Sequence, residues 1–437
     1  MGSLCKEHGR HKLIMTSETR TLNGITERKP RPWVYAATSF SILVSLGFPG
    51  LYTKVFGGAL GTLTGYGAFF LQLFIMLVYS AGRVTEIKLI SLQKKYMPIY
   101  FFLITVFIVS MIGTSDAGEE VISCVRVCVT AIFALWLCDH MTTEEILTCT
   151  YNAMILYVAA AVVFAVMFPG YYNRPDGQEL AFMGIEDTKN VTAMIMSFGI
   201  IMQYLLWRVR SGRNQSVSGF FVLFFAVEIL LLVLCDSTSA TMTALLVILL
   251  VIFTGDRIRV NTGLICVVLS ILLLIFAMTV LPVLAPLLNA IGEDATLTGR
   301  TPLWAHLLDV IRENHTMVGY GYGHFWLDAE AVALVHTGFS GQSFMSHMTA
   351  GAHNNILELW LNTGLIGLLS FFTMLIASFS NPRKITRDRY MFCLAFMAFY
   401  TLVGLTERNW STYGYKMIYL FLAAGMACTK TEISGNE

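Results

Sequence analysis

The sequence is poor in charge. Of its 437 residues only 13% are charged, whereas 56% are hydrophobic, and the net charge of +1 provides no overall attraction for nucleic acid. Its nine cysteines form no CxxC pair and no Cys/His spacing typical of a metal site. The P-loop, HExxH and GxSxG patterns are missing, as is the early apolar core of a secretory signal. This composition is too apolar for a soluble chain of this length.

Long apolar runs make up most of the chain. A helix that crosses a bilayer needs about 20 apolar residues. Runs near that length cover 34–52, 60–82, 98–113, 121–138, 146–168, 190–207, 218–234, 238–254, 263–281, 355–379, 390–405 and 412–428. The sequence therefore predicts an all-α, polytopic integral membrane protein with about 12 transmembrane helices.

Lysine and arginine are concentrated in every second loop between these runs, which is typical of cytoplasmic loops. This asymmetry predicts that both termini are cytoplasmic. We expect a cytoplasmic N-terminal tail over 1–32, a single membrane domain over 33–428 and a cytoplasmic tail over 429–437. One large loop, 282–354, falls on the opposite, periplasmic side and should contain short helices.

The large loop has a pattern of its own. Thr301 and Pro302 predict the start of a short helix that would lie on the membrane or on the bundle. Its apolar face would consist of Leu303, Leu307, Val310 and Ile311. Glycine at every second position from 319 to 323, between aromatic residues, indicates a tight turn near the interface. Residues 338–351, rich in Gly, Ser and Thr, are typical of a lid.

A histidine stands just before the apolar run that follows this loop. His353 would lie at the interface with a pKa suited to a general base, and Asn354 or Asn355 would cap the helix. Asn354, Glu358 and Asn362 recur every fourth residue, so they share one helix face that should point into protein or a wet cavity. Alternatively, His353 merely assists the cap and the polar stripe joins helices.

Arg300 precedes the Pro302 helix, so its guanidinium and the positive helix end would converge on one anion. Phosphate is the natural candidate, because a guanidinium matches it with two parallel hydrogen bonds. The alternative is an arginine that lies on lipid headgroups.

Other cations stand at membrane depth or in outer loops. Arg126 and Lys416, each about two turns from the outer end of its run, should face the bundle interior. Glu228 and Asp236 are candidate partners that would neutralise them structurally. Arg408 adds a further outer cation.

Three acids gather after the third apolar run, at Asp116, Glu119 and Glu120. Acids in one loop can hold a divalent metal, but this group lacks Asp-x-Asp spacing. We therefore predict no metal site.

Several short motifs together resemble a known family. They are Gly299–Trp304 (GRTPLW), Gly319–Gly323 (GYGYG), His353-Asn354 with Gly364 and Gly367, Lys189-Asn190, and Asp236–Ala240 (DSTSA). In this order and spacing the chain resembles the O-antigen ligase and polymerase (Wzy-type) superfamily, and most of all exopolysaccharide polymerases of the ExoQ type.

The resemblance implies a GT-C-like membrane glycosyltransferase that inverts configuration without metal or other cofactor. It would polymerise undecaprenyl-diphosphate-linked oligosaccharide repeat units at the periplasmic face of the bacterial inner membrane. His353 would be the base, assisted by Glu358 or Asn354. The residues expected to bind the diphosphate are Arg300, Lys189, Arg126, Lys416 and Arg408.

Two other functions stay open on the sequence. An O-antigen ligase, which transfers the glycan to lipid A core, would need the same donor site and base. A flippase or exporter of lipid-linked sugar would also collect interior cations, but it should show two related halves. Besides donor, glycan acceptor and membrane lipids, a chain-length regulator is an expected partner, and nucleic acid is not.

Overall fold

The computed structural model describes residues 19–22, 25–28, 32–47, 58–81, 93–168, 175–176, 179–186, 188–254, 258–290, 296–297, 299–313, 315–337, 351–405, 407 and 414–429. The region predicted to act as a lid lies outside this part of the chain, apart from Gly351.

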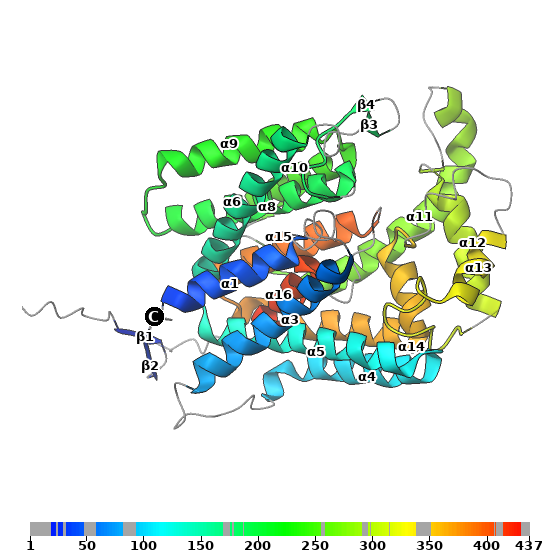
Figure 1. Ribbon diagram of the computed structural model, residues 1–437, viewed down its shortest axis with the longest axis horizontal. Helices are drawn as coiled ribbons and strands as arrows, with labels where there is room; N and C mark the ends of the chain where they lie inside the picture. Colours follow the sequence, from blue (N-terminus) through cyan, green and yellow to red (C-terminus); the bar gives the residue numbers. More distant parts are fainter. Residues whose placement is uncertain are drawn as a thin grey trace, which may run out of the picture.

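A bundle of apolar helices makes up most of the described structure (Figure 1). The helices are α1 (Pro32–Ser45), α3 (Gly58–Ala81), α4 (Met97–Gly113), α5 (Ala117–His140), α6 (Thr143–Met167), α8 (Lys189–Ser211), α9 (Gly219–Leu234), α10 (Thr238–Thr254), α11 (Thr262–Ala290), α14 (Asn355–Ser378), α15 (Arg387–Val403) and α16 (Tyr415–Cys428). Each coincides with one predicted apolar run. Within the described residues, six helices are long and apolar enough to cross a membrane, and others are shorter apolar helices.

Smaller elements complete the fold. They are the one-turn helices η2 (Lys94–Tyr96) and η4 (Pro382–Lys384), the loop helices α12 (Arg300–Glu313) and α13 (Ala329–Thr337), and two antiparallel hairpins, β1 (Thr19–Leu22) with β2 (Ile25–Arg28) and β3 (Pro175–Asp176) with β4 (Glu179–Leu180). Thr19 pairs with Arg28 and Leu22 with Ile25 in the first hairpin.

Side-chain caps fix where several helices begin. Asp116 accepts hydrogen bonds from the first backbone N–H groups of α5, and Thr142 forms a capping box with Glu145 at the start of α6. Thr188 and Asn354 cap α8 and α14 in the same way. These side chains satisfy N–H groups that have no partner within the helix, so they set the residue at which each helix begins.

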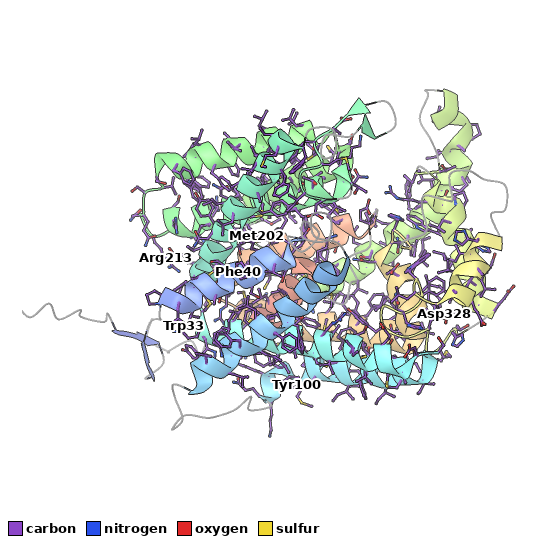
Figure 2. The ribbon with its side chains drawn as sticks, in the orientation of Figure 1. Trp33, Phe40, Tyr100, Met202, Arg213 and Asp328 are labelled. Carbon is purple, nitrogen blue, oxygen red and sulfur yellow. The ribbon has the colours of Figure 1, made fainter. Side chains whose placement is uncertain are left out.

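The helix ends meet in two groups. At one end, the basic end, contacts between loops include Lys95–Asp139, Arg213–Asp388 and Arg259–Ile385. At the other, the loop end, which carries α12 and α13, they include Ser115–Asp328, Lys189–Asp236 and Asn355–Gly404. Figure 2 shows Arg213 and Asp328 on opposite sides of the molecule. Each group joins loops that the lysine and arginine pattern assigns to one side, so the alternation of helix ends agrees with the prediction.

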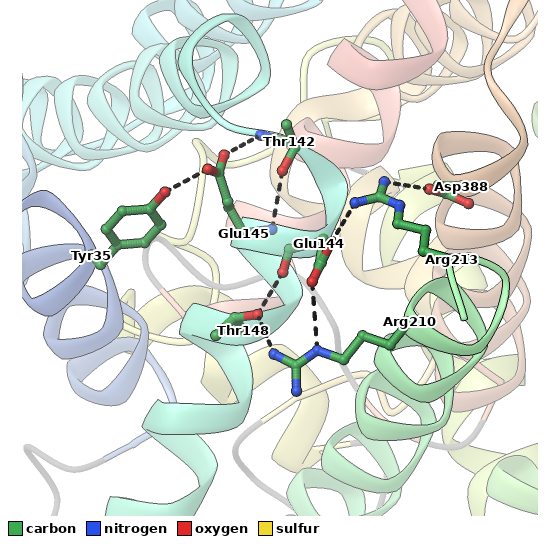
Figure 3. Close-up of polar contacts among 8 residues, drawn as sticks. All are labelled: Tyr35, Thr142, Glu144, Glu145, Thr148, Arg210, Arg213 and Asp388. Atoms are coloured by element: carbon green, nitrogen blue, oxygen red, sulfur yellow. Dashed lines mark hydrogen bonds and ion pairs between the residues drawn. The ribbon is translucent and has the colours of Figure 1, made fainter. Parts of the chain in front are cut away.

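An ion-pair network ties the basic end together (Figure 3). Glu144 at the start of α6 pairs with Arg213 and lies 3.6 Å from Arg210 of α8, while Arg213 also bonds Asp388 of α15 at 3.0 Å. These side chains are 18–35% exposed. The network therefore links three helices, although solvent weakens each pair.

Glu144→Ala should lower the free energy of unfolding by about 1 kcal/mol, because it leaves two neighbouring arginines without their shared carboxylate. Thermal unfolding in detergent measures the change, with Glu313→Ala as a control at an exposed acid. High salt should shrink the difference. Equal melting temperatures for Glu144→Ala and wild type would show that the network contributes nothing.

Helix α14 is broken at Gly364, whose φ of +64° is not helical. The loop before α13 fills the break, since the N–H groups of Leu365 and Ile366 donate to the carbonyls of Thr316 and Met317. In the other direction, Tyr320 N–H donates to the Leu361 carbonyl at 2.9 Å. Because every backbone polar group at membrane depth needs a partner, this exchange is what permits the break.

Two boundaries at the large loop differ from the prediction. Helix α11 continues to Ala290, through Pro282 and Pro286, although the ninth span was expected to end at 281. A proline removes only one hydrogen bond, and apolar helices tolerate this loss. Helix α12 begins at Arg300, before the predicted cap Thr301. Its predicted apolar face is buried against the bundle rather than on the membrane.

Candidate functional site

One carboxylate lies at the centre of the loop end. Glu407 lies just beyond the last turn of α15. Its Oε2 lies 3.1 Å from His353 Nδ1, and its Oε1 accepts a hydrogen bond from Arg300 Nη2 at 3.2 Å. Its backbone N–H is held by the Val403 carbonyl at 2.9 Å, which continues the helical turn of α15. Two residues that the sequence singled out therefore meet on a single side chain that it did not.

Charges around Glu407 keep it ionised. Burial raises its pKa, but the hydrogen bond and charge of His353, and then the charges of Arg300 and Lys416, outweigh burial and hold the pKa below its ordinary value of 4.5. Because the folded pKa is the lower one, the carboxylate is ionised at neutral pH, and its stabilising interactions with Arg300 and Lys416 are lost only as the pH falls through this pKa.

The backbone aims the His353 ring. His353 has φ of +47°, a left-handed conformation that ordinary side chains rarely adopt. It lies between Ala352, whose backbone N–H and carbonyl are both hydrogen-bonded, and Asn354. The Asn354 side chain caps α14 by accepting from the N–H groups of Ile356 and Leu357. Its side chain is 24% exposed, and within the described residues Nε2 has no hydrogen-bond partner. An imidazole held through Nδ1–H presents Nε2 as its basic nitrogen.

Glu358 acts on the backbone rather than as the partner of His353. Its Oε2 accepts from Ala352 N–H at 2.7 Å, and both oxygens accept from the indole N–H of Trp326. The Ala352 carbonyl in turn accepts from Trp304 Nε1 at 2.8 Å. The structure thus pairs His353 with Glu407, where the sequence proposed Glu358 or Asn354, because helical geometry turns Glu358 inward beneath the loop.

The polar stripe of α14 is buried in protein, as predicted. Asn354, Glu358 and Asn362 are only 2–3% exposed. Asn362 bonds the Glu358 carbonyl and accepts from Gly323 N–H at 2.9 Å. The stripe therefore joins α14 to the loop, which is a structural role like that of the alternative interpretation, with the loop in place of a second helix.

Arg300 retains unused donor capacity. Its side chain is 16% exposed, and its Nε is buried without a hydrogen-bond partner among the described residues. It is the first residue of α12, so the positive end of that helix lies beside the guanidinium. This arrangement leaves Arg300 able to bind a further anion besides the Glu407 carboxylate.

Lys416 and Lys189 stand at the ends of helices that adjoin this cluster. Lys416, in the first turn of α16, lies 3.8 Å from the sulfur of Met194. Met194 is in the second turn of α8, and Lys189 is the first residue of that helix. Lys189 pairs with the exposed Asp236 at 3.6 Å, so Asp236 neutralises Lys189 rather than Arg126 or Lys416.

The remaining predicted cations are placed less closely. Arg126 is half-buried on α5, which packs along α16. Helix α5 begins beside Ser115 at the loop end and reaches Asp139 at the basic end, and Lys416 stands in the first turn of α16 beside Met194 near the start of α8. Arg126 and Lys416 therefore both lie in the part of their helix that is nearer the loop end. Glu228 is fully buried, and neither carboxylate oxygen has a hydrogen-bond partner among the described residues. Arg408 lies outside the described part of the chain.

The three acids considered for a metal are separated by their local structure. Asp116 caps α5, and Glu120 turns into the bundle, where it accepts from Tyr322 N–H at 2.7 Å. Glu119 stays exposed. Within the described residues no group of three His, Cys, Asp or Glu side chains is arranged to hold a metal ion.

The sequence did not single out Glu407. It stands beside Arg408 in the segment between the last two apolar runs, where no periodicity or cap pattern marks it. A usable signal was present, because an acid among several outer cations is expected to pair with one of them.

The fold and site define a multi-pass membrane protein whose loop end gathers a histidine, a bridging carboxylate and cations. Residues 220–372 match the family model described as O-antigen ligase, a segment that contains Arg300 and His353. The chain is also similar to the exopolysaccharide production protein ExoQ of Rhizobium meliloti (strain 1021), with 27% identity over 273 residues. The predicted resemblance is confirmed.

The match to ExoQ covers 57% of this chain and 58% of that relative. It thus spans little more than half of either protein. No solved structure matches the chain.

Proposed function

We propose that this protein is an inverting glycosyltransferase that polymerises undecaprenyl-diphosphate-linked oligosaccharide repeat units at the periplasmic membrane face. The observation that carries the proposal is the meeting of His353 and Arg300 on Glu407, which sets a base beside a phosphate-binding cation. The family match over both residues supports it. The relative's name supports exopolysaccharide as the product class.

In the proposed reaction, an acceptor hydroxyl attacks the anomeric carbon of the donor glycan. His353 Nε2 takes the hydroxyl proton as the new C–O bond forms. The bond from the anomeric carbon to the phosphate oxygen breaks at the same time, and the lipid diphosphate leaves with the electron pair. A single displacement of this kind inverts the anomeric configuration.

Cations at the loop end would stabilise the leaving diphosphate. Arg300 supplies unused N–H donors and the end of α12, and Lys416 contributes positive charge close to Glu407. Arg126, Lys189 and Arg408 complete the proposed donor set. Preorganised positive groups of this kind act on charge that develops in the transition state, so they raise the rate as well as the affinity.

An apolar cavity lies between α11, α14 and α15, next to this site. Its lining includes Val267, Asn355, Leu359, Phe371 and Met397. Asn355 adjoins the cap residue of α14, so the cavity reaches the helix end that carries His353. Its volume of about 20 Å³ holds no more than about one water molecule, so it is too small for an isoprene unit and we assign no part of the donor to it.

An O-antigen ligase is the second candidate, since the matching family model carries that description. Both reactions use one donor site and one base, and they differ in the acceptor. Purified protein supplied with the lipid-linked repeat unit alone should produce a ladder of glycan lengths in detergent. A single product, formed only with a lipid A core acceptor, would identify a ligase. Because detergent leaves no compartments, product formation also excludes transport as the primary activity.

Arg300→Ala should lower the rate of this reaction by roughly a hundredfold and weaken donor binding, because one preorganised donor to the leaving group is lost. Arg300→Lys should recover only part of the rate, since an ammonium lacks the paired hydrogen bonds. Arg312→Ala is the control, at a 72% exposed arginine of the same helix. The proposal fails if Arg300→Ala elongates donor as fast as Arg312→Ala.

A further inference from the structure

We propose that Glu407 is a positioning residue that couples donor binding to the base: when the lipid diphosphate arrives, Arg300 is transferred from Glu407 to the diphosphate, and Glu407 then serves His353 alone. This inference rests on the proposed function and adds to it a residue outside the family match, which ends at residue 372. No resemblance or pattern assigned Glu407 a role.

The geometry supports two distinct tasks for the two carboxylate oxygens. Oε2 lies 3.1 Å from His353 Nδ1, and Oε1 lies 3.2 Å from Arg300 Nη2. A carboxylate at Nδ1 fixes the imidazole orientation and stabilises the cation that forms when Nε2 takes a proton. An ion pair with Arg300 reduces this help, because the same negative charge is shared with a guanidinium.

Arg300 is suited to change partners. Its pair with Glu407 uses Nη2, while Nε stays buried without a partner among the described residues. A diphosphate offers several negative oxygens and can accept two parallel hydrogen bonds from the guanidinium, so it competes well with one carboxylate oxygen. Lys416, the other cation acting on Glu407, lies on a different helix and remains to neutralise part of its charge.

The coupling predicts opposite effects on binding and rate. In Glu407→Gln, Arg300 no longer has to leave a carboxylate, so a lipid diphosphate should bind roughly three- to tenfold more tightly, in keeping with a partly exposed pair. The turnover number should nevertheless fall about tenfold or more, because His353 becomes a weaker base. The acidic limb of the pH–rate profile should move to lower pH, since removing a neighbouring negative charge lowers the pKa of an imidazole.

A double-mutant cycle isolates the exchange. In an Arg300→Ala background, Glu407→Gln should leave the affinity for lipid diphosphate unchanged, because no guanidinium is shared. Glu407→Asp should keep the acidic limb near its wild-type position. Glu330→Gln is the control at an exposed acid of α13. The melting temperature in detergent shows whether Glu407→Gln is folded. If it is unfolded, Glu407→Asp replaces it in the binding assay. An affinity of Glu407→Asp for lipid diphosphate that lies between those of wild type and Arg300→Ala would then contradict the exchange.

Weaker donor binding by folded Glu407→Gln, or an acidic limb that does not move, would overturn the inference. These outcomes leave the proposed function intact as long as wild type still elongates the donor. If wild type forms no product, the proposed function itself fails. The affinity measurements with lipid diphosphate still report separately whether Arg300 and Glu407 compete.

Discussion

Replacing His353 with Asn is expected to lower the rate of glycan transfer by at least about a hundredfold, while donor binding stays close to wild type. Asn provides an N–H near the position of Nδ1, so it can still donate to Glu407, but it has no basic nitrogen to take the acceptor proton. Asn also tolerates the left-handed conformation of this position, where Ala would add strain. Single-turnover assays with lipid-linked donor measure the rate, and lipid diphosphate binding measures the affinity.

His336→Ala serves as the control for this substitution. His336 lies on α13 in the same loop and is exposed. It should retain wild-type activity, since it takes no part in the cluster. Full activity in both variants would end the assignment of His353 as the base.

Replacing Gly364 with Ala is expected to cost about 3 kcal/mol of stability or more, and it should reduce the yield of folded protein. A Cβ at this position would lie 2.2 Å from the backbone carbonyl of Met317 and 2.3 Å from Val318 N. The φ of +64° adds strain for any residue with a side chain. Because backbone, rather than a flexible side chain, occupies the space, the loop has to leave the break in α14.

Thermal unfolding in detergent measures this loss, and Gly67→Ala is the matched control. Gly67 is an exposed position inside α3, where a Cβ meets no atom within 4 Å. Alanine there should stabilise the helix by up to about 1 kcal/mol. If Gly364→Ala melts at or above the temperature of Gly67→Ala, the loop does not fill the break as described.

The sequence predicts the helices well because bilayer-spanning segments have a long and uniform signal. Each predicted run coincides with a helix, and the lysine and arginine pattern groups the helix ends correctly. The break at Gly364 escaped prediction. Hydropathy averages over a window, and the hydrogen bonds that permit the break come from the loop around Met317, some fifty residues earlier.

The site was predictable only where its residues carry a local sequence signal. His353 and Arg300 carry local signals, one beside a helix cap and one at a helix start, and the structure brings them together. Their common partner Glu407 comes from a different loop, and no periodicity links it to either residue. The inward position of Glu358 depends on hydrogen bonds from the Trp326 indole and from Ala352 N–H, which sequence spacing cannot describe.

The anomeric configuration of the newly formed linkage, compared with that of the donor, tests the central claim most directly. NMR of glycan released after reaction of purified protein with lipid-linked repeat units measures it. If the His353 base drives a single displacement of the lipid diphosphate, the configuration is inverted in every new linkage. Retained configuration would contradict this mechanism, because it requires a second displacement that a single base does not provide.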